Sequence, residues 1–462
     1  MKAMFRKINS IHFVGIGGSG MSGIAEVLLS YGYRVSGSDL KKSPTTDRLE
    51  KMGATVCVGH DPKNIEGSEV VVVSSAINVD NPELIAARYR NIPIIRRAEM
   101  LAEIMRMKYG IAVAGAHGKT TTTSMLAHIM EDGGLDPTVI IGGRLAKYNA
   151  NAKAGNGPLM VAEADESDGS FMRLSPTIAI VTNLDEEHLE HYKGGMAEIE
   201  ETFLAFMNKV PFYGLVVACK DDARLEALLS QVSRKVITYG LKSGADLAAA
   251  NIRTAGFETT FELMVRGDRF GEVTLSVPGN HNVLNALAAI AVAMEFDVPM
   301  DVVVPSLKKF TGADRRFHMV GEARKRTLVD DYAHHPTEIQ VTMDAASKAW
   351  DSKIIGVFQP HRYSRFKHCW ERFLDSFEHA DHVVVMPVFP AGEKPLPDVD
   401  SARFAEELSQ KHPSVSHLEN EEQLSQHLME QSSEGDLIIG LGAGTIGKLC
   451  REIHQEWSKN NI

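Results

Sequence analysis

A glycine-rich stretch near the middle of the chain has residue types suited to phosphate binding. It reads AGAHGKTTTT and differs from the usual G-x-x-x-x-G-K-[ST] pattern because Val113 stands where the first glycine belongs. In such loops backbone N–H groups surround the phosphates, the lysine reaches the β- and γ-phosphates and the hydroxyl binds Mg²⁺. We call this stretch the second glycine loop. It predicts ATP contacts at Gly115, Ala116, His117, Gly118, Lys119, Thr120 and Thr121.

Two further residues are candidates for the metal site beside Thr120. Glu163 follows the apolar run LMVA, and His188 follows TIAIVTN. Carboxyl ends of parallel strands meet at one edge of a sheet, and Mg²⁺ prefers oxygen ligands. We therefore expect Thr120, Glu163 and His188 to form a metal site. The acidic residues near Glu163 are expected to be electrostatic neighbours or loop-formers, namely Asp165, Glu166 and Asp168.

A first glycine loop lies near the start of the chain, after the apolar run IHFV. Its G-x-G-x-x-G spacing, with Asp39 at the end of the next strand, matches the dinucleotide fingerprint, so an NAD-dependent oxidoreductase is one hypothesis. The same spacing recurs at Gly442–Gly447, so the pattern is not specific. Because the loop recognises a diphosphate, we favour a nucleotide-linked substrate. The candidate residues are Gly15, Gly17, Gly18, Ser19, Gly20 and Asp39.

Apolar runs alternate with helical patterns along the chain and predict an α/β protein with mostly parallel sheets. Each of three segments opens with such a run, and the boundaries fall near residues 107 and 315. In the second segment, IAVA predicts a buried strand before the glycine loop. Met125, Leu126, Ile129 and Met130 share one face of the helix that follows it. A glycine loop between such a strand and helix directs several N–H groups at one point.

Composition restricts the class of protein. The 462 residues carry a net charge of −11, which argues against a general nucleic-acid binder. We expect a cytoplasmic protein without a membrane segment, because no apolar run approaches roughly 18–20 residues. The four cysteines are scattered without C-x-x-C spacing and predict free thiols.

Eight blocks, taken in order, resemble the signature blocks of the Mur ligases, and more closely those of the branch that adds alanine. They read GIGGSGMSG, AGAHGKTTTT, EADESD, NLDEEHLEHY, GNHNVLNALAA, GADRRF, VDDYAHHPTE and FQPHRYSR. The resemblance implies a Rossmann-like UDP-substrate domain (residues 1–107), a central P-loop-type ATP-binding domain (108–315) and a Rossmann-like C-terminal domain with the amino-acid site (316–462).

The resemblance also assigns roles to individual residues. It implies ATP contacts at His281, Asn282, Asn285, Arg316 and Asp331, and adds Ser74 to the UDP-sugar set. It places the amino-acid and acyl-phosphate site at His334, His335, Arg362 and Arg365. It implies catalytic roles for Lys119, Glu163, His188 and Arg316. One departure is that sister ligases carry a carbamylated lysine where this chain has Thr202.

The implied activity uses ATP and Mg²⁺, or Mn²⁺ in its place, to join L-alanine to the lactyl carboxylate of UDP-N-acetylmuramate. It proceeds through an acyl phosphate, releases ADP and phosphate, and is the first amino-acid addition in peptidoglycan precursor synthesis. The alternatives are a murein-peptide recycling ligase, an NAD-dependent oxidoreductase and a non-catalytic nucleotide-binding module. We expect a monomer or homodimer.

Overall fold

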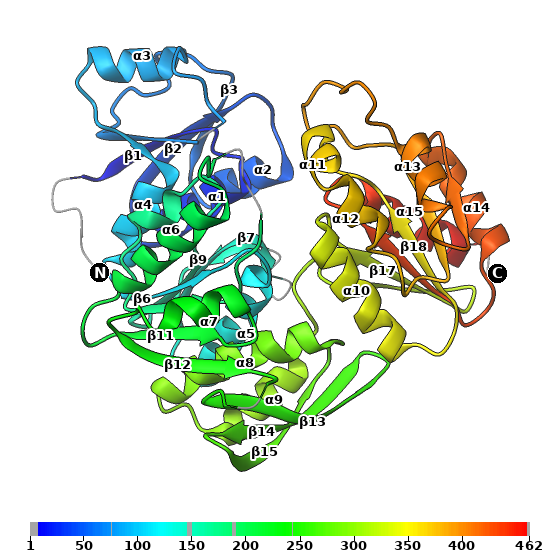
Figure 1. The fold of residues 1–462 in the computed structure, drawn as a ribbon. Helices are drawn as coiled ribbons and strands as arrows, with labels where there is room; N and C mark the ends of the chain where they lie inside the picture. The colour runs from blue at the N-terminus through cyan, green and yellow to red at the C-terminus, as the bar shows by residue number, and fades with distance from the viewer. Residues whose placement is uncertain (1–7, 75, 146–149, 187–190, 243, 460–462) are drawn as a thin grey trace. The chain divides into compact units, whose positions relative to one another are not determined.

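The computed structural model describes residues 8–74, 76–145, 150–186, 191–242 and 244–459. These residues form three sheets distributed over two compact units (Figure 1). The first unit contains Met1–Ala249, Leu263–Phe270 and Leu284–Leu307. The second contains Ala250–Glu262, Gly271–Val283 and Lys308–Ile462.

The N-terminal domain is built on a parallel five-stranded sheet with the order β3-β2-β1-β4-β5. Its central strand β1 is buried on both faces, because His12 and Val14 alternate with Ile11 and Phe13 and all four are fully buried. Val14 packs with residues of helix α3, so Ile11 and Phe13 point to the opposite face. The strands are β1 (Ser10–Val14), β2 (Arg34–Asp39), β3 (Thr55–Val58), β4 (Val70–Val73) and β5 (Ile94–Arg96). The helices are α1 (Ser19–Ser30), α2 (Pro44–Lys51), α3 (Pro82–Tyr89) and α4 (Arg97–Met105).

The central domain contains a ten-stranded sheet with the order β15-β14-β13-β12-β11-β10-β6-β9-β7-β8. The strands from β12 to β7 run parallel, and β8 pairs antiparallel with β7. The strands are β6 (Tyr109–Ala114), β7 (Thr138–Leu145), β8 (Ala150–Lys153), β9 (Leu159–Glu163), β10 (Ile178–Val181), β11 (Leu215–Cys219), β12 (Lys235–Gly240), β13 (Leu247–Ala255), β14 (Glu258–Val265) and β15 (Asp268–Leu275). The helices are α5 (Lys119–Asp132), a 3₁₀ turn (Ser170–Arg173), α6 (Met196–Asn208), α7 (Ala223–Leu229), α8 (Asn280–Glu295) and α9 (Met300–Lys309).

Within the first unit, the N-terminal domain packs directly on the central domain. Helix α1 contacts strands β7 and β8. A Cβ added to Gly23 of α1 would lie 3.3 Å from the Cβ of Ala152 in β8, so the helix needs a small residue there. The Tyr31 hydroxyl at the end of α1 lies 2.8 Å from Thr138 Oγ1 in β7.

The C-terminal domain is a six-stranded sheet with the order β16-β17-β21-β18-β19-β20. Only the β16–β17 pair is antiparallel among its described pairs. The strands are β16 (His318–Ala323), β17 (Arg326–Asp331), β18 (Ile354–Phe358), β19 (His382–Val385), β20 (Val415–His417) and β21 (Leu437–Leu441). The helices are α10 (Pro336–Ala349), α11 (Tyr363–His368), α12 (Trp370–Leu374), α13 (Ser401–Leu408), a 3₁₀ turn (Glu421–Gln423), α14 (Leu424–Gln431) and α15 (Ile446–Lys459).

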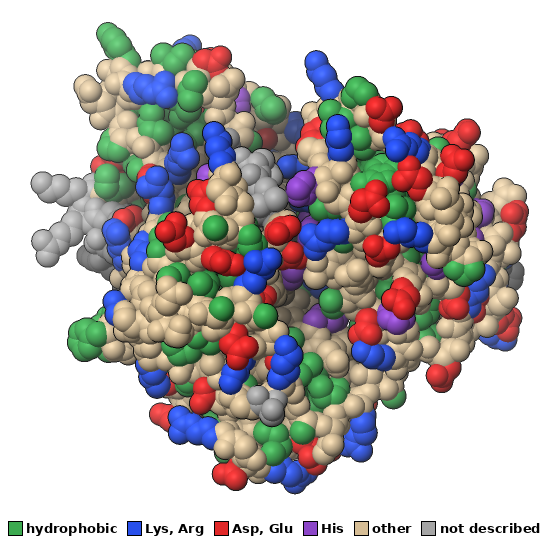
Figure 2. All heavy atoms as spheres, viewed as in Figure 1, with side chains coloured by type: hydrophobic (Ala, Val, Ile, Leu, Met, Phe, Trp, Pro, Cys, Tyr) green, Lys and Arg blue, Asp and Glu red, His purple; other side chains and the backbone are tan. Residues whose placement is uncertain are grey.

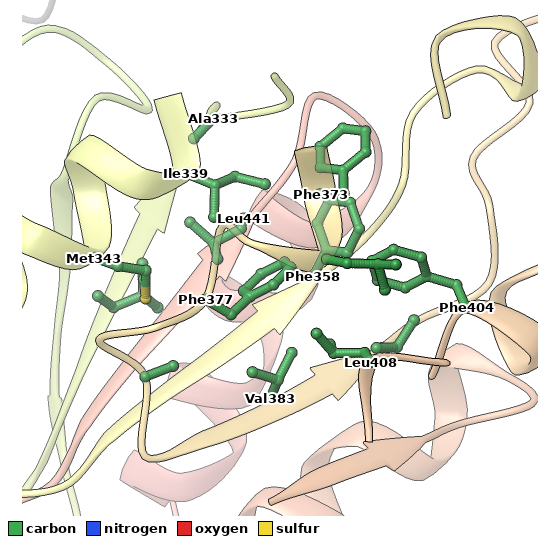
Figure 3. Close-up of a cluster of buried hydrophobic side chains, with 14 of the residues drawn as sticks. Ala333, Ile339, Met343, Phe358, Phe373, Phe377, Val383, Phe404, Leu408 and Leu441 are labelled. Carbon is green, nitrogen blue, oxygen red and sulfur yellow. The ribbon is translucent and has the colours of Figure 1, made fainter. Parts of the chain in front are cut away.

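The core of the C-terminal domain on one face of its sheet is centred on Phe358 at the end of β18 (Figure 3). Its ring centroid lies 5.1 Å from that of Phe373, 5.3 Å from that of Phe377 and 6.0 Å from that of Phe404. A second core contains residues of α14 and α15. These two cores fix β18 and β21. The carboxyl end of β18 leads into the predicted site residues Arg362 and Arg365.

Acidic and basic side chains are interspersed over the displayed face of both units (Figure 2). The described helices include none that is both long and apolar enough to cross a membrane. All four cysteines, Cys57, Cys219, Cys369 and Cys450, carry free thiols.

Candidate active site

The second glycine loop turns the chain from strand β6 into helix α5. Gly115 has a φ of +128° and Gly118 a φ of +83°, in the region that favours glycine. A Cβ on Gly115 would lie 2.1 Å from Thr182 Oγ1, and one on Gly118 would lie 2.6 Å from Asn285 Oδ1. Both positions therefore require glycine for backbone conformation and for space.

Helix α5 begins at Lys119 with Gly118 as its N-cap and without a capping side chain. The N–H groups of a first helical turn lack partners within the helix and favour an anion. Two backbone amides of the glycine loop already have partners within the protein. Ala116 N donates to Asn183 O (3.2 Å), and His117 N donates to Asn183 Oδ1 (2.8 Å). The first turn of α5 therefore offers the amides suited to a phosphate.

The Lys119 ammonium lies across this loop. Its Nζ donates to Gly115 O (2.6 Å), to Ala116 O (2.9 Å) and to Glu166 Oε1 (2.7 Å). Glu166 is only 5% exposed, and burial raises its pKa to about 7, although the charge of Lys119 opposes this effect. A carboxyl that changes charge near neutral pH thus contacts the predicted phosphate-binding lysine.

Two predicted metal ligands, Thr120 and Glu163, lie against the same short stretch of strand β7. A Cβ on Gly142 would lie 2.9 Å from Glu163 Oε2, and a Cβ on Gly143 would lie 3.2 Å from Thr120 Cγ2. A hydroxyl and a carboxylate are oxygen donors of the kind that Mg²⁺ accepts. The third predicted ligand, His188, lies outside the described residues.

The acidic loop Glu163–Asp168 directs its other carboxylates to separate partners. Asp165 Oδ2 accepts a hydrogen bond from Arg97 Nη2 at 3.0 Å, while Asp168 Oδ1 accepts one from Ser170 N at 2.9 Å. Asp168 therefore shapes the loop, and Asp165 connects it to the N-terminal domain.

The first glycine loop leads from β1 into α1, and Asp39 holds it in shape. Gly17 N donates to Asp39 Oδ2 at 2.9 Å, and a Cβ on Gly17 would lie 2.8 Å from that oxygen. The other Asp39 oxygen accepts from Leu40 N at 2.8 Å. The dinucleotide hypothesis gives Asp39 a ribose hydroxyl as its partner, whereas here the carboxylate binds two backbone amides.

The remaining residues of the UDP-sugar prediction lie around the same loop. Gly18 is the N-cap of α1 and no side chain caps this helix, so its first turn, starting at Ser19, resembles that of α5. A Cβ on Gly15, whose φ is +82°, would lie 3.5 Å from Ser74 Cβ. A Cβ on Gly20 would lie 2.9 Å from Arg97 Cδ.

The three predicted ATP contacts in helix α8, His281, Asn282 and Asn285, have different surroundings. Asn285 lies in the first unit, where its Oδ1 accepts from Thr122 Oγ1 at 3.0 Å and borders Gly118. Asn282 lies in the second unit and donates to Pro278 O at 2.8 Å. Burial, with a smaller contribution from the charge of Arg316, lowers the pKa of His281 to about 4, although Asp344 opposes this effect.

Arg316 and Asp331 lie at one end of strand β17. Arg316 Nη1 donates to Glu338 Oε1 at 3.0 Å, and its guanidinium carbon lies 5.2 Å from the ring centroid of Tyr332. Asp331 accepts from Phe317 N at 2.9 Å and from Ala333 N, and burial raises its pKa to about 6. Asp331 therefore braces the loop around Arg316.

The predicted amino-acid residues gather around a histidine that the sequence prediction did not single out. The His361 ring centroid lies 5.8 Å from that of His334, and His361 Nδ1 lies 3.2 Å from Arg365 Nη1. Burial lowers the pKa of His361 to about 3, and the neighbouring His334 and arginines add to this effect. Arg362 adopts a φ of +66° at the start of α11. The fourth predicted residue, His335, is 1% exposed and precedes α10.

Two residues therefore join the candidate site on structural grounds, Tyr332 and His361. Both stand inside sequence blocks already noted, VDDYAHHPTE and FQPHRYSR, next to residues that were singled out. Proximity to those arginines and histidines was the only signal available in the sequence.

The second G-x-G-x-x-G stretch, Gly442–Gly447 before helix α15, is filled by a side chain of the protein. Gln359 Oε1 accepts from Ile446 N at 3.0 Å, and Gln359 Nε2 donates to Thr445 Oγ1 at 2.8 Å. A Cβ on Gly444 would lie 2.5 Å from Gln359 Oε1. The glycine spacing here accommodates a glutamine amide at the helix start.

Comparisons with known proteins agree with this architecture. The chain matches the Mur ligase family, catalytic domain, over residues 10–109, the Mur ligase middle domain over 113–293, and the Mur ligase, glutamate ligase domain, over 315–444. The chain belongs to the Mur ligase family.

Comparisons with individual relatives indicate which members of the family this chain is similar to. The chain is 52% identical over 446 residues to the UDP-N-acetylmuramate–L-alanine ligase of Geobacter sulfurreducens, covering 96% of both chains. The crystal structure of UDP-N-acetylmuramate–alanine ligase from Thermotoga maritima is 30% identical, with a TM-score of 0.83 over 98% of this chain and 100% of that one. The structure of a murein peptide ligase from Psychrobacter arcticus is 25% identical, with a TM-score of 0.67 over 98% of this chain and 99% of that one.

Proposed function

We propose that this protein is an ATP-dependent ligase that joins L-alanine to the lactyl carboxylate of UDP-N-acetylmuramate, the first amino-acid addition in peptidoglycan precursor synthesis. The observation that carries the proposal is that two glycine-capped helix N-termini, at α1 and α5, lie in one compact unit. The chain is also about half identical, over nearly its whole length, to ligases named for this reaction. One helix start suits the UDP diphosphate and the other suits the ATP triphosphate.

In the first step the lactyl carboxylate attacks the γ-phosphate of ATP, which gives an acyl phosphate and ADP. A carboxylate and a triphosphate repel each other, so the protein must supply positive charge where they meet. We assign this role to Lys119, to the first-turn amides of α5 and to Arg316. Holding the reactants in line can lower the barrier by roughly 7–11 kcal/mol.

A divalent cation fits the oxygen donors Thr120 and Glu163, which both border the glycine pair of β7. Bound there, Mg²⁺ would neutralise charge on the ATP phosphates. Gly142 and Gly143 of β7 have no side chains and so leave the space that Glu163 and Thr120 occupy.

In the second step the amine of L-alanine attacks the acyl phosphate, and phosphate leaves as the amide forms. We assign the alanine carboxylate to Arg362 and Arg365, because a guanidinium pairs well with a carboxylate. His361, Tyr332 and His334 would surround the same substrate. The amine must lose a proton to react. We assign this proton to His334 or His335, because the lowered pKa of His361, about 3, makes that residue a weak base.

Two observations favour this activity over its rivals. The alanine-adding structure has the higher TM-score and identity, 0.83 and 30%, against 0.67 and 25% for the murein peptide ligase. Asp39, which a dinucleotide-dependent oxidoreductase would use for a ribose, bonds to Gly17 N and Leu40 N.

The direct test measures phosphate release from ATP, Mg²⁺ and UDP-N-acetylmuramate, with each amine added in turn. We expect L-alanine to support release and the tripeptide of the recycling ligase to be a poor substrate. Release with the tripeptide alone would support the recycling activity. Saturable NAD(H) binding without substrate-dependent ADP formation would support the oxidoreductase.

A further inference from the structure

Arg97, the first residue of helix α4, lies between the two glycine loops. On one side its guanidinium packs against the first turn of α1, because a Cβ on Gly20 would lie 2.9 Å from Arg97 Cδ and 3.0 Å from Arg97 Nη1. On the other side its Nη2 donates to Asp165 Oδ2 at 3.0 Å. The last glycine of the first loop, Gly20, thus leaves the space that this arginine side chain occupies.

Asp165 continues the connection to the ATP loop. It is followed by Glu166, whose Oε1 lies 2.7 Å from Lys119 Nζ. Ser167 N donates to Asp165 Oδ1 at 3.1 Å, and this bond holds the turn of the acidic loop. The contacts therefore run without interruption from the helix start at the first loop to the phosphate-binding lysine of the second.

The stability of the fold does not account for this arrangement. The Arg97 and Asp165 side chains are 25% and 43% exposed, and ion pairs at that exposure add roughly 0–1 kcal/mol. Their position has a different consequence, because Arg97 can order two loops that must act on the same reaction.

We propose that Arg97 is a positioning residue that couples occupancy of the first glycine loop to ATP binding at the second, acting through Asp165. This inference rests on the proposed function, since it requires a UDP-linked substrate at one loop and ATP at the other. A diphosphate at the start of α1 orders the adjacent guanidinium, which in turn fixes Asp165 and the acidic loop. Coupling of this kind is reciprocal, so ATP would favour the UDP-substrate equally.

The test measures binding of a non-hydrolysable ATP analogue with Mg²⁺ by calorimetry, with and without UDP-N-acetylmuramate and without alanine. In the unaltered protein we expect the sugar nucleotide to tighten analogue binding by about fivefold or more. Arg97→Gln and Asp165→Asn should each reduce that factor to about one, while either ligand alone binds within about threefold of normal. Arg97→Lys should retain part of the factor, because it keeps the charge but loses the planar fork.

A matched control is a second ion pair to helix α4, made by Arg173 of the 3₁₀ turn. Arg173 Nη1 lies 2.6 Å from Glu99 Oε1 of α4, and their side chains are 49% and 32% exposed. This pair also joins α4 to the central domain but contacts neither glycine loop in the described contacts. Arg173→Gln should leave the coupling factor unchanged.

Three results would overturn the inference. In the first, the coupling factor is unchanged in Arg97→Gln. In the second, Arg97→Gln loses the sugar nucleotide altogether with normal analogue binding, which would make Arg97 a simple diphosphate ligand. In the third, Arg173→Gln loses the coupling equally. If the unaltered protein turns over normally, any of these three results leaves the proposed function intact. If the unaltered protein binds neither the ATP analogue nor UDP-N-acetylmuramate, both proposals are removed.

Discussion

Lys119 Nζ lies 2.7 Å from Glu166 Oε1, so the lysine predicted to bind ATP phosphates is engaged by a buried carboxyl. The triphosphate and Glu166 therefore compete for the same ammonium. Burial of Glu166 reduces the cost of losing this partner, because it raises the pKa of the carboxyl to about 7 and favours its neutral form. ATP binding would then be linked to protonation of Glu166.

This linkage predicts a pH dependence of ATP-analogue binding. Below pH 7 Glu166 is protonated and repels the triphosphate least, so affinity should fall as the pH rises through about 7, by up to about tenfold per pH unit. Titrations of a non-hydrolysable analogue from pH 6 to 8.5 measure this. Glu166→Gln should show a flatter profile, and because the nucleotide's own ionisation is common to both proteins, identical profiles would contradict the linkage.

The same pKa shift predicts a change in stability. The folded-state pKa of Glu166 lies above its ordinary value of 4.5, so the native state binds the proton more tightly. Stability should therefore decrease as the pH rises from about 4.5 to about 7. Denaturant melts of the unaltered protein and of Glu166→Gln check this, and the difference in their unfolding free energies should change across that window in favour of the variant at higher pH.

Lys119→Ala should reduce turnover by at least about 10²–10³, because it removes a donor placed where charge develops. Phosphate release in the presence of all three substrates is the measurement. The sugar nucleotide should still bind to the variant, which a separate titration can verify. Near-normal turnover would refute the assignment of the ATP loop.

The requirement for glycine at position 118, before helix α5, can be tested against Gly134, which follows the same helix and has a similar backbone conformation. Gly118 and Gly134 have φ values of +83° and +75°, but a Cβ on Gly118 meets Asn285 Oδ1 at 2.6 Å while one on Gly134 meets nothing within 4 Å. Both alanine variants should lose about 1–2 kcal/mol of stability to backbone strain. Only Gly118→Ala should also lose ATP-analogue binding, and equal binding by the two variants would contradict the geometry.

Adjacent arginines in the C-terminal domain should behave differently. Arg316→Ala should lower kcat with little change in sugar-nucleotide affinity. Arg315→Ala should instead destabilise the fold, by up to about 3 kcal/mol, because Arg315 Nε pairs at 3.2 Å with the fully buried Asp330, which would keep only Arg451 as a partner. Kinetics and denaturant melts on both variants distinguish the roles, and a large loss of stability in Arg316→Ala would assign it a structural role.

The fold class and both glycine loops could be predicted from local patterns. A strand, a glycine turn and a helix are adjacent in sequence, so their spacing alone indicates the element and the helix N-terminus. The apolar face Met125, Leu126, Ile129 and Met130 is fully buried, as the helical period predicts.

Contacts between distant segments could not be predicted in the same way. The approach of Arg97 to Gly20, and of Gly142 to Glu163, depends on how the N-terminal domain and strand β7 pack, which no local period encodes. A glycine pattern can also suggest a ligand site where none is needed. At Gly442–Gly447 the N-terminus of α15 binds the side chain of Gln359.

The central claim is that ATP transfers its γ-phosphoryl group to the carboxylate of the sugar nucleotide. It is tested most directly with UDP-N-acetylmuramate labelled with ¹⁸O in its lactyl carboxylate, incubated with the protein, ATP, Mg²⁺ and L-alanine. The acyl-phosphate route predicts one ¹⁸O atom in each inorganic phosphate released, because a carboxylate oxygen leaves with the phosphoryl group. Release of unlabelled phosphate, or label found in AMP, would contradict it.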